Sequence, residues 1–217
     1  MAAVERALLA AAAGYLLGTL PSADAAARLA TGGRVDLRTR GTGNPGAVNA
    51  MAVLGRGWGS AVLGADMAKA VVAARLGERL AGARGAHLGA SAAVVGHCFP
   101  AWRGWRGGKG VAASCGQCLA TFPAYFPVDL AVALVAAKGG GRALPATAAA
   151  SVLWVVAGTL WWRRRLPNGW GPAPSAALPL AAAVSSAAIL ARFVQSPVPA
   201  RPLGPAGDGD PREWAAA

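Results

Sequence analysis

The chain has 217 residues, 55% of them hydrophobic, with a mean hydropathy of +0.42 and a formal net charge of +12. Apolar runs with few charges recur along nearly the whole chain, so the composition excludes an ordinary soluble domain and indicates an integral membrane protein. The basic residues cluster between these runs instead of alternating with aromatic residues on a polar domain, which favours membrane orientation over nucleic-acid binding.

Apolar segments follow one another along the chain. The stretch at 111–137 is long for one crossing and short for two, and Pro123 and Pro127 favour a break within it. We therefore predict an all-α membrane protein, a bundle of about seven (roughly five to seven) transmembrane helices with short interfacial helices and glycine-rich cytoplasmic loops. Residues 1–196 would form this polytopic domain, and residues 197–217, rich in proline, glycine and charge, a disordered cytoplasmic tail. The apolar segments are Ala7–Leu29, Ser60–Leu76, Ala86–Trp102, Val111–Val128, Asp129–Ala137, Leu144–Trp162 and Ala173–Phe193.

The positions of the basic loops predict the topology. Arg28–Arg40, Arg103–Lys109 and Lys138–Arg142 fall on one side of the membrane together with Arg192. The positive-inside rule makes that side cytoplasmic. In this topology Arg163–Arg165 lie on the opposite side, against the rule.

The stretch Arg38–Asn49 combines three glycines with two arginines and several short hydrogen-bonding side chains. Asn44 is a favoured N-cap and Pro45 suits the first helical position, so we predict a short interfacial helix from here to Leu54. Glycines before a helix start let the backbone approach a ligand, and the helix N-terminus attracts anions. The stretch therefore predicts a phosphate site at a membrane face, with a structural turn that binds no ligand as the alternative.

Gly41, Gly43 and Gly46 also fit the G-x-G-x-x-G pattern of dinucleotide-binding folds, with Asp66 in the place of the ribose-binding acid. That fold needs a strand before the glycines and a soluble βαβ unit around them. The preceding residues are polar and basic, and Asp66 lies within an apolar run, so the context disfavours dinucleotide binding.

Two charged residues, Asp66 and Lys69, lie within one apolar segment. They are three residues apart and therefore on one helix face. Charges inside a span are costly unless they are paired or functional. A structural ion pair and a role beside a site remain open alternatives.

Cys115 and Cys118 are spaced C-x-x-C, and with His97 and Cys98 they offer four metal ligands. Thiols in an apolar helical run are ordinarily packing residues, however. We therefore predict no metal site.

A second glycine-rich basic loop, Arg103–Gly110, opens directly onto an apolar segment. Its glycine spacing, and the lack of Ser or Thr after Lys109, exclude a Walker A loop. Arg103 and Arg106 are interpreted as interfacial charges, whereas Lys109, with glycine on both sides, is expected to contact a ligand. His97, just upstream, either anchors the loop or acts at the site.

These stretches resemble a known family, the bacterial membrane-integral glycerol-3-phosphate acyltransferases that use acyl-phosphate as donor. Order and spacing agree over roughly the first half of the chain. The matching residues are Gly18–Pro21, Val35–Arg38 with Gly41–Asn49, Leu54–Gly55, Asp66 with Lys69, Gly96–Pro100, and Gly107–Ala112.

The resemblance implies a helical bundle that transfers a fatty acyl group from acyl-phosphate to glycerol 3-phosphate. The products would be lysophosphatidic acid and inorganic phosphate, the entry step of phospholipid synthesis. The family implies no metal, nucleotide, acyl-CoA or other cofactor, and no obligate protein partner is inferred. The partners would be the two substrates and membrane lipid, and the protein would span the bacterial inner (plasma) membrane several times with its site on the cytoplasmic side.

Three residues are assigned to catalysis by this resemblance: Lys109, Thr42 and His97. Acyl-phosphate is already activated, so positioning of the two phosphates and charge neutralisation by Lys109 and backbone amides would supply much of the catalysis. The residues expected to bind the substrates are Thr19, Arg38, Arg40, Gly41, Gly43, Asn44, Gly46, Asn49, Gly107, Gly108 and Gly110.

The second half of the chain departs from the family pattern. Lys138–Pro145 and Arg192–Pro197 stand where family members carry a serine-containing basic motif and a motif with histidine and asparagine. Ala52 replaces an arginine, whereas Thr19 and Thr42 keep the hydroxyls of serines. The alternative is therefore a catalytically silent homologue that binds lipid phosphate or acts as a membrane interaction protein. Basic residues that would substitute in an active enzyme are Lys138, Arg142 and Arg192.

Overall fold

The computed structural model of the protein describes residues 2–137 and 143–195. Across these ranges it is helical and contains no strand, which confirms the all-α prediction and removes the strand that a dinucleotide fold requires. The predicted tail at 197–217 and the basic residues Lys138 and Arg142 lie outside the described residues. The helices are α1 (Ala3–Gly18), α2 (Ser22–Thr31), α3 (Ala47–Leu54), α4 (Arg56–Cys98), α5 (Val111–Thr121), α6 (Phe126–Ala137), α7 (Ala143–Arg164) and α8 (Ala177–Gln195), with a short 3-10 helix at Ala101–Arg103.

The chain divides into two compact units. The larger unit contains the described residues up to Leu20 and those from Asp66 to Gln195. The smaller unit contains Pro21–Ala65. Helix α4 contributes to both units, because the boundary falls within it.

Helix α4 bends in the larger unit. Ala81 (φ −140°, ψ 23°) and Gly82 (φ 63°, ψ −155°) leave helical geometry, and glycine adopts the positive φ without strain. The two arms, 56–80 and 83–98, correspond to the second and third predicted apolar segments.

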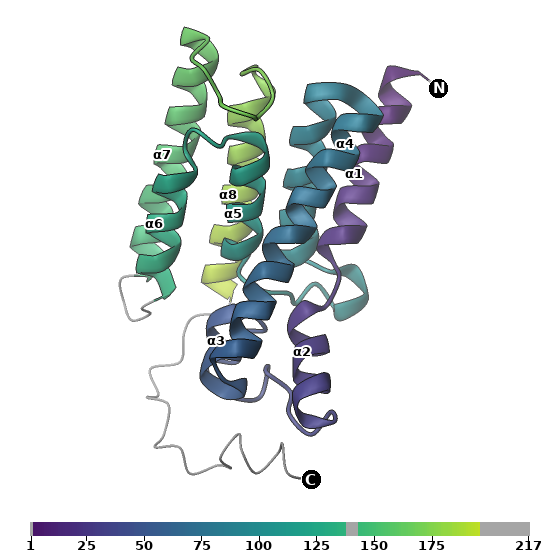
Figure 1. Cartoon of the computed structure of the whole chain (residues 1–217), viewed down its shortest axis with the longest axis vertical. Helices are drawn as coiled ribbons and strands as arrows, with labels where there is room; N and C mark the ends of the chain where they lie inside the picture. Colours follow the sequence, from purple (N-terminus) through teal and green to yellow (C-terminus); the bar gives the residue numbers. More distant parts are fainter. Residues whose placement is uncertain (1, 138–142, 196–217) are drawn as a thin grey trace. The chain divides into compact units, whose positions relative to one another are not determined.

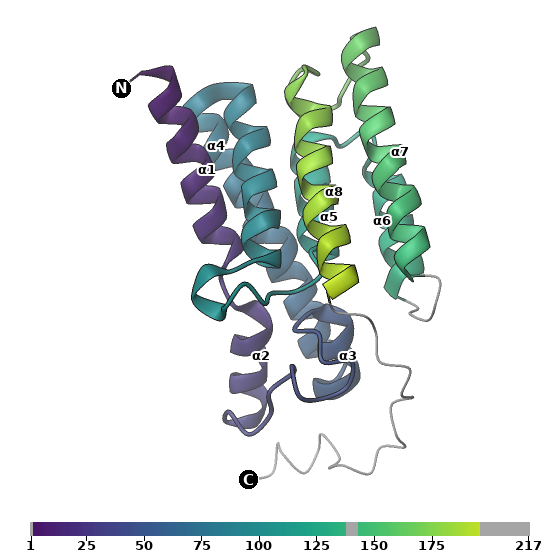
Figure 2. The same ribbon diagram turned by 180° about the vertical axis from the view of Figure 1, so that it is seen from behind.

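Helix α1 packs very closely against α4 (Figures 1 and 2). A Cβ at Gly14 would overlap the backbone of Gly89, and one at Gly18 would overlap the backbone of Ala93. Small residues at such positions let two helix backbones touch, as is common between membrane helices. The contact fixes the end of α1, which lies beside the candidate site.

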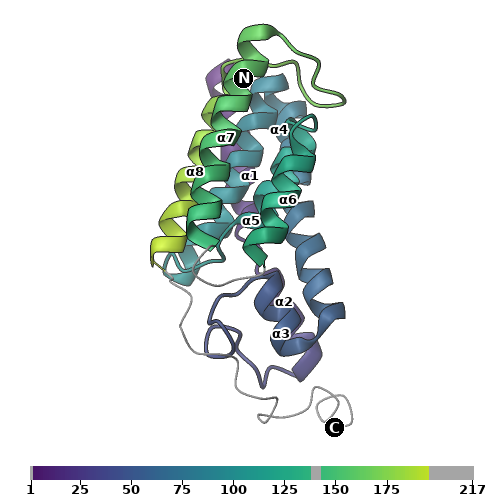
Figure 3. The ribbon, with the colours of Figure 1, turned by 90° about the vertical axis from the view of Figure 1, so that its left-hand side faces the viewer.

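Helices α5 to α8 lie side by side in the larger unit, and α7 contacts both α6 and α8 (Figure 3). The predicted break within 111–137 is confirmed, but it falls around Pro123, several residues before the predicted boundary at Asp129. Pro127 does not interrupt α6, because it lies in the first turn, where its missing N–H leaves no helical bond unmade.

Three described helical runs are long and apolar enough to cross a membrane: Ala3–Thr31, Ala143–Arg164 and Ala177–Gln195. The first was predicted as one segment but contains α1 and α2, which separate before Ser22 because Pro21 lacks the N–H that would continue the helix. The remaining predicted crossings correspond to the charged arms of α4 and to the short helices α5 and α6, of 11 and 12 residues.

The smaller unit has its own apolar core between α2 and α3, with Leu37 of the connecting loop only 1% exposed within it. Helix α3 ends at Leu54, as predicted, but the predicted start at Asn44 and Pro45 is wrong. The N–H of Gly46 bonds to the carbonyl of Asn44 at 2.9 Å, so the chain turns there and Gly46, in an extended conformation, becomes the N-cap.

Candidate active site

In the smaller unit, the loop between α2 and α3 is held by Asn49 of α3, which is 1% exposed. Its Nδ2 donates to the carbonyls of Leu37 (2.9 Å) and Arg40 (3.0 Å), and its Oδ1 accepts the N–H of Thr42 at 2.8 Å. A Cβ at Gly41 (φ 58°) would overlap the Asn49 amide, so this position requires glycine. Asn49, a predicted substrate-binding residue, therefore has both polar side-chain atoms bonded to the loop.

Arg38 of the same loop is paired with acidic residues. Its guanidinium bonds both carboxylate oxygens of Asp24 in α2, with 3.3 Å between Nη2 and Oδ2, and lies 3.6 Å from Asp36. The hydrogen bond to Asp24 raises the pKa of Arg38, so the guanidinium stays charged. A phosphate at Arg38 would have to compete with these carboxylates.

The tip of this loop presents Gly41 and Gly43 at the surface, and Thr42 is half-buried between them. The Oγ1 of Thr42 accepts the N–H of Asn44 at 3.4 Å. Both glycines have positive φ, 58° and 70°. The bonds of Asn49 and Thr42 and the two positive-φ glycines therefore define the conformation of the loop tip.

In the larger unit, a buried charge network lies on α4. The Nζ of Lys69 is 2.8 Å from Oδ1 of Asp66, which confirms that the two share a helix face, and Nδ1 of His97 lies 3.4 Å from the same oxygen. Lys69 also donates to the carbonyl of Leu20 at 2.8 Å. Asp66 and Lys69 are only 1% and 6% exposed. Their contacts link both arms of α4 to the chain directly after α1.

The chain just after α4 is fixed by Tyr15 of α1. The Tyr15 hydroxyl donates to the carbonyl of Phe99 at 2.8 Å and accepts the N–H of Ala101 at 2.9 Å. Nearby, the buried hydroxyl of Thr19 donates to the carbonyl of Leu16 at 2.6 Å. Thr19 is the C-cap of α1, and its predicted substrate-binding role stays a prediction. The contacts of Tyr15 had no sequence signal.

The second glycine loop rests directly on the end of α4. The N–H of Gly107 donates to the carbonyl of Cys98 and that of Gly108 to the carbonyl of His97, both at 3.1 Å. A Cβ at Gly107 would overlap the His97 carbonyl, and one at Gly108 would overlap the imidazole. Only glycine fits at these two positions, so the loop is fixed to His97.

Lys109 projects from this braced loop and is half-buried. Its Nζ lies 4.5 Å from the centre of the Phe193 ring, a cation–π contact with the last turn of α8. Burial and the nearby charge of Arg192 lower the pKa of Lys109. The charge of Lys109 is therefore held beside a second cation.

Arg192, 5% exposed, reaches the loop from α8. Its Nη2 donates to the carbonyl of Gly107 at 2.8 Å, and its guanidinium lies 5.8 Å from the centre of the Phe99 ring. The Nε atom is buried and has no hydrogen-bond partner among the described residues. Arg192 and Phe193 therefore hold the two ends of the Gly107–Lys109 segment.

The cysteines form no metal site in the described part of the chain. Cys98, Cys115 and Cys118 are buried free thiols, and no group of three or more His, Cys, Asp or Glu residues gathers there. Cys98 and Cys118 pack within apolar clusters of the larger unit.

The structure thus separates the predicted site residues into two sets. The larger unit brings together His97, Gly107, Gly108, Lys109 and Gly110, with Thr19 at the end of α1. The smaller unit holds Arg38, Arg40, Gly41, Thr42, Gly43, Asn44, Gly46 and Asn49.

Comparison with known proteins gives the class of the molecule, an integral membrane acyltransferase. A family model described as glycerol-3-phosphate acyltransferase matches residues 8–196. The chain therefore belongs to the glycerol-3-phosphate acyltransferase family.

The similarity holds for individual sequences and for solved structures. The chain is 39% identical to a glycerol-3-phosphate acyltransferase of Synechococcus sp. (strain JA-2-3B'a(2-13)) over 159 residues, 70% of this chain and 77% of that protein. It is 43% identical to that of Gloeobacter violaceus over 129 residues, 57% of this chain and 60% of that protein. The crystal structure of PlsY (YgiH), an integral membrane glycerol 3-phosphate acyltransferase in its glycerol 3-phosphate form, matches with a TM-score of 0.61 and 27% identity, covering 87% of this chain and 88% of that one.

Proposed function

We propose that the protein transfers a fatty acyl group from acyl-phosphate to glycerol 3-phosphate, releasing lysophosphatidic acid and inorganic phosphate. The observation that carries this proposal is the placement of Lys109 at the end of a rigid glycine loop beside Arg192. Two adjacent cations repel each other, and a phosphate, which both substrates carry, would relieve that repulsion. Solved relatives in glycerol 3-phosphate and lysophosphatidic acid forms support the acceptor and the product.

The proposed step is a substitution at the acyl carbon. The oxygen of a glycerol hydroxyl bonds to that carbon, the bond from the carbon to the phosphate oxygen breaks, and the hydroxyl proton leaves with the phosphate. Lys109 would stabilise the negative charge that grows on the departing phosphate. Because the N–H groups of Gly107 and Gly108 are already bonded to α4, these glycines contribute rigidity.

His97 is assigned as a positioning residue. Its Nδ1 faces Asp66, its carbonyl accepts the N–H of Gly108, and its ring fills the space beside Gly108. These contacts orient the loop that carries Lys109. A loop held in one geometry keeps the charge where the phosphate departs.

Arg192 and Phe193 account for part of the missing family motif. Arg192 supplies a buried guanidinium to the loop, and Phe193 supports Lys109, both from the stretch that stands in place of the family's motif with histidine and asparagine. Of the three basic residues expected to substitute, Arg192 is the one within the described residues.

We place the site on the cytoplasmic face of the bacterial inner membrane. Arg103, Arg106 and Lys109 lie in the loop that Arg192 contacts, and the positive-inside rule favours this end of the larger unit for the cytoplasm. The connection after Arg165 lies at the opposite end, because Asn168 donates to the carbonyl of Thr121 at the end of α5. Arg163–Arg165 thus remain the exception to the rule.

A catalytically silent homologue is the second candidate. Arg38 is engaged by Asp24 and Asn49 is engaged by its own loop, and Ala52 stands where the family has arginine. A loop whose polar groups are already bonded favours a structural role over substrate binding.

The test supplies purified protein in detergent with acyl-phosphate and glycerol 3-phosphate and measures both phosphate and lysophosphatidic acid. Equal amounts of the two products are expected, with far less of both from Lys109→Ala. A parallel reaction with acyl-CoA tests the donor, and product from acyl-CoA alone would overturn the acyl-phosphate assignment. No product above Lys109→Ala, with both proteins folded, would establish the silent homologue.

A further inference from the structure

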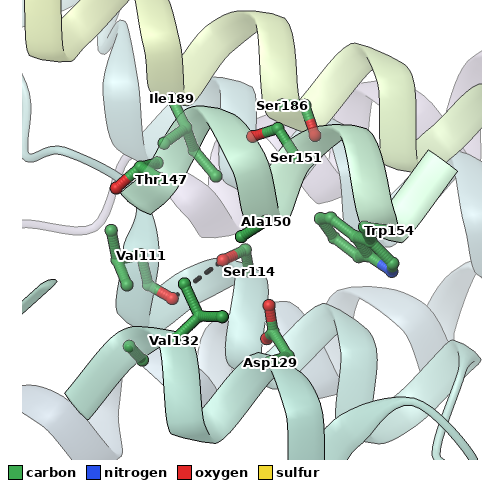
Figure 4. Close-up of a pocket in the computed structure, with 11 residues that line it drawn as sticks. Val111, Ser114, Asp129, Val132, Thr147, Ala150, Ser151, Trp154, Ser186 and Ile189 are labelled. Atoms are coloured by element: carbon green, nitrogen blue, oxygen red, sulfur yellow. Dashed lines mark hydrogen bonds between the residues drawn. The ribbon is translucent and has the colours of Figure 1, made fainter. Parts of the chain in front are cut away.

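Four helices of the larger unit line a partly open cavity of about 30 Å³ that contains no residue assigned to the proposed reaction. Figure 4 shows Asp129 on its α6 side and Ser151 on its α7 side. The lining residues are Val111 and Ser114 of α5, Asp129, Val132 and Ala133 of α6, Thr147, Ala150, Ser151 and Trp154 of α7, and Ser186 and Ile189 of α8.

The cavity is rich in oxygen atoms that can accept a bond. Oδ2 of Asp129 and Oγ of Ser186 are buried without a hydrogen-bond partner. Ser114 and Thr147 already donate their hydroxyl hydrogens to the carbonyls of Val111 (2.9 Å) and Ala143 (2.7 Å), which leaves their oxygens as acceptors. Buried polar atoms are almost always satisfied, so these oxygens indicate a ligand or water.

The charge of the cavity is negative. Asp129 is its one ionisable residue, since no lysine, arginine or histidine is among the lining residues. A carboxylate inside an apolar bundle is costly unless a positive charge accompanies it. The missing counter-charge must therefore come from a bound cation or from a proton.

The size and the donor atoms select the kind of cation. A volume of about 30 Å³ has room for about two water molecules or for one small ion. Oxygen ligands suit a hard cation, and the described residues hold no cluster suited to a transition metal. A single carboxylate balances one positive charge. Calcium takes about six to eight oxygen ligands, and magnesium usually keeps several waters, for which this cavity lacks room.

We propose that this cavity is a sodium-ion site in which the carboxylate of Asp129 and the hydroxyl oxygens of Ser114, Thr147, Ser151 and Ser186 hold the cation. These five residues come from α5, α6, α7 and α8, so the ion ties the four helices together. Val111 of the lining follows Gly110 directly, and Ser186 lies on α8, whose last turn carries Arg192. The proposal is independent of acyl transfer.

The first experiment measures thermal unfolding of the full chain in detergent with sodium chloride, potassium chloride or choline chloride at constant ionic strength. Sodium should raise the apparent Tm in a saturable manner, by about 5 °C at a hundredfold excess over its Kd, and choline should not. The same shift with all three salts, or none with any, overturns the proposal. Stability that depends on pH but not on sodium identifies a protonated carboxyl and overturns it too.

Two variants locate the site, and each uses the sodium response as its readout. Asp129→Asn removes the charge at nearly constant shape and should abolish the response. Ser186→Ala should weaken the apparent sodium affinity roughly tenfold, the scale of losing one metal-site interaction. The matched control is Ser91→Ala, which removes an equally buried serine that bonds to its own helix outside the cavity. A full response in Asp129→Asn, or equal losses in Ser186→Ala and Ser91→Ala, would place the ion elsewhere.

Discussion

In the loop at Arg38–Asn49 the polar side chains bond to the loop and its own unit, whereas the loop at Arg103–Gly110 is held by the helices around it. Asn49 and Asp24 engage the first loop, and its cation Arg38 is matched by carboxylates. The second loop bonds to α4 and α8 and keeps Lys109 beside Arg192. Two loops of similar composition therefore differ in the charge they can offer a ligand. The second has the stronger claim to a reacting phosphate.

The largest effect is expected for Lys109→Ala. The loss of one group that stabilises developing charge typically lowers turnover on the order of 100-fold or more. The rate of phosphate release from acyl-phosphate, with glycerol 3-phosphate present, measures it. Arg103→Ala removes an equal charge from the exposed part of the same loop and should change the rate little. Equal losses in the two variants would contradict a specific role for Lys109.

The first loop should respond most to Asn49→Ala. Removing the amide leaves the carbonyls of Leu37 and Arg40 and the N–H of Thr42 without this partner, at a cost of about 3 kcal/mol of unfolding free energy. Thermal unfolding in detergent should show an apparent Tm lower by about 6 to 12 °C. The control is Asn44→Ala, because Oδ1 of Asn44 bonds to no described residue. Wild-type stability in Asn49→Ala would mean that the loop is not held in this way.

Arg192 should have an intermediate effect. Arg192→Gln removes the charge beside Lys109 and the bond to Gly107. We expect kcat/KM to fall roughly tenfold, mainly through a higher KM for acyl-phosphate. Arg192→Lys keeps the charge and should recover part of the loss. Arg163→Gln, at the other end of the unit, is the control. A fall in Tm with unchanged kinetic constants would assign Arg192 to packing alone.

The pH dependence should report the charge of Lys109. Burial and the charge of Arg192 lower the pKa of Lys109 below the ordinary 10.5. Its ammonium therefore loses its proton at a lower pH than a free lysine does, and kcat/KM should fall as the pH rises through this pKa. Arg192→Gln removes the neighbouring charge and should move the fall to higher pH. An unshifted alkaline limb in that variant would separate the limb from Lys109.

The smallest effect is expected for Asp24→Asn. The side chains of Asp24 and Arg38 are 22% and 28% exposed, so the loss of this ion pair should lower stability by less than about 1 kcal/mol. If the first loop binds phosphate through Arg38, the variant should also lower KM, because a competing carboxylate has gone. A loss of stability as large as that of Asn49→Ala would make the ion pair the main support of the loop.

Sequence spacing predicted the features that depend on residues close together in the chain. The pairing of Asp66 with Lys69 follows from helix periodicity, and the break at Pro123 follows from its missing N–H. The helix start at Asn44 was wrong, because the bond from Gly46 to the Asn44 carbonyl turned the chain where capping alone predicted a helix.

Contacts between distant residues could not be predicted in this way. Arg192 and Gly107 are 85 positions apart, and the Phe193 ring meets Lys109 only when α8 packs beside α5. From the sequence alone, Phe193 was only part of the stretch Arg192–Pro197, which departs from the family's motif with histidine and asparagine. The structure places the Phe193 ring against Lys109, so this residue of the departing stretch supports the second loop.

The end of the first helix depends on a residue made much later. Lys69 donates to the carbonyl of Leu20, 49 positions before it, and both lie in the larger unit. While the ribosome has not yet produced α4, the carbonyls at the end of α1 must bond to water or to the insertion machinery, because hydrocarbon offers no donor. The carbonyl of Leu20, just after α1, therefore gains its partner only when the first arm of α4 has been made, and an N-terminal fragment that stops before Lys69 lacks this bond.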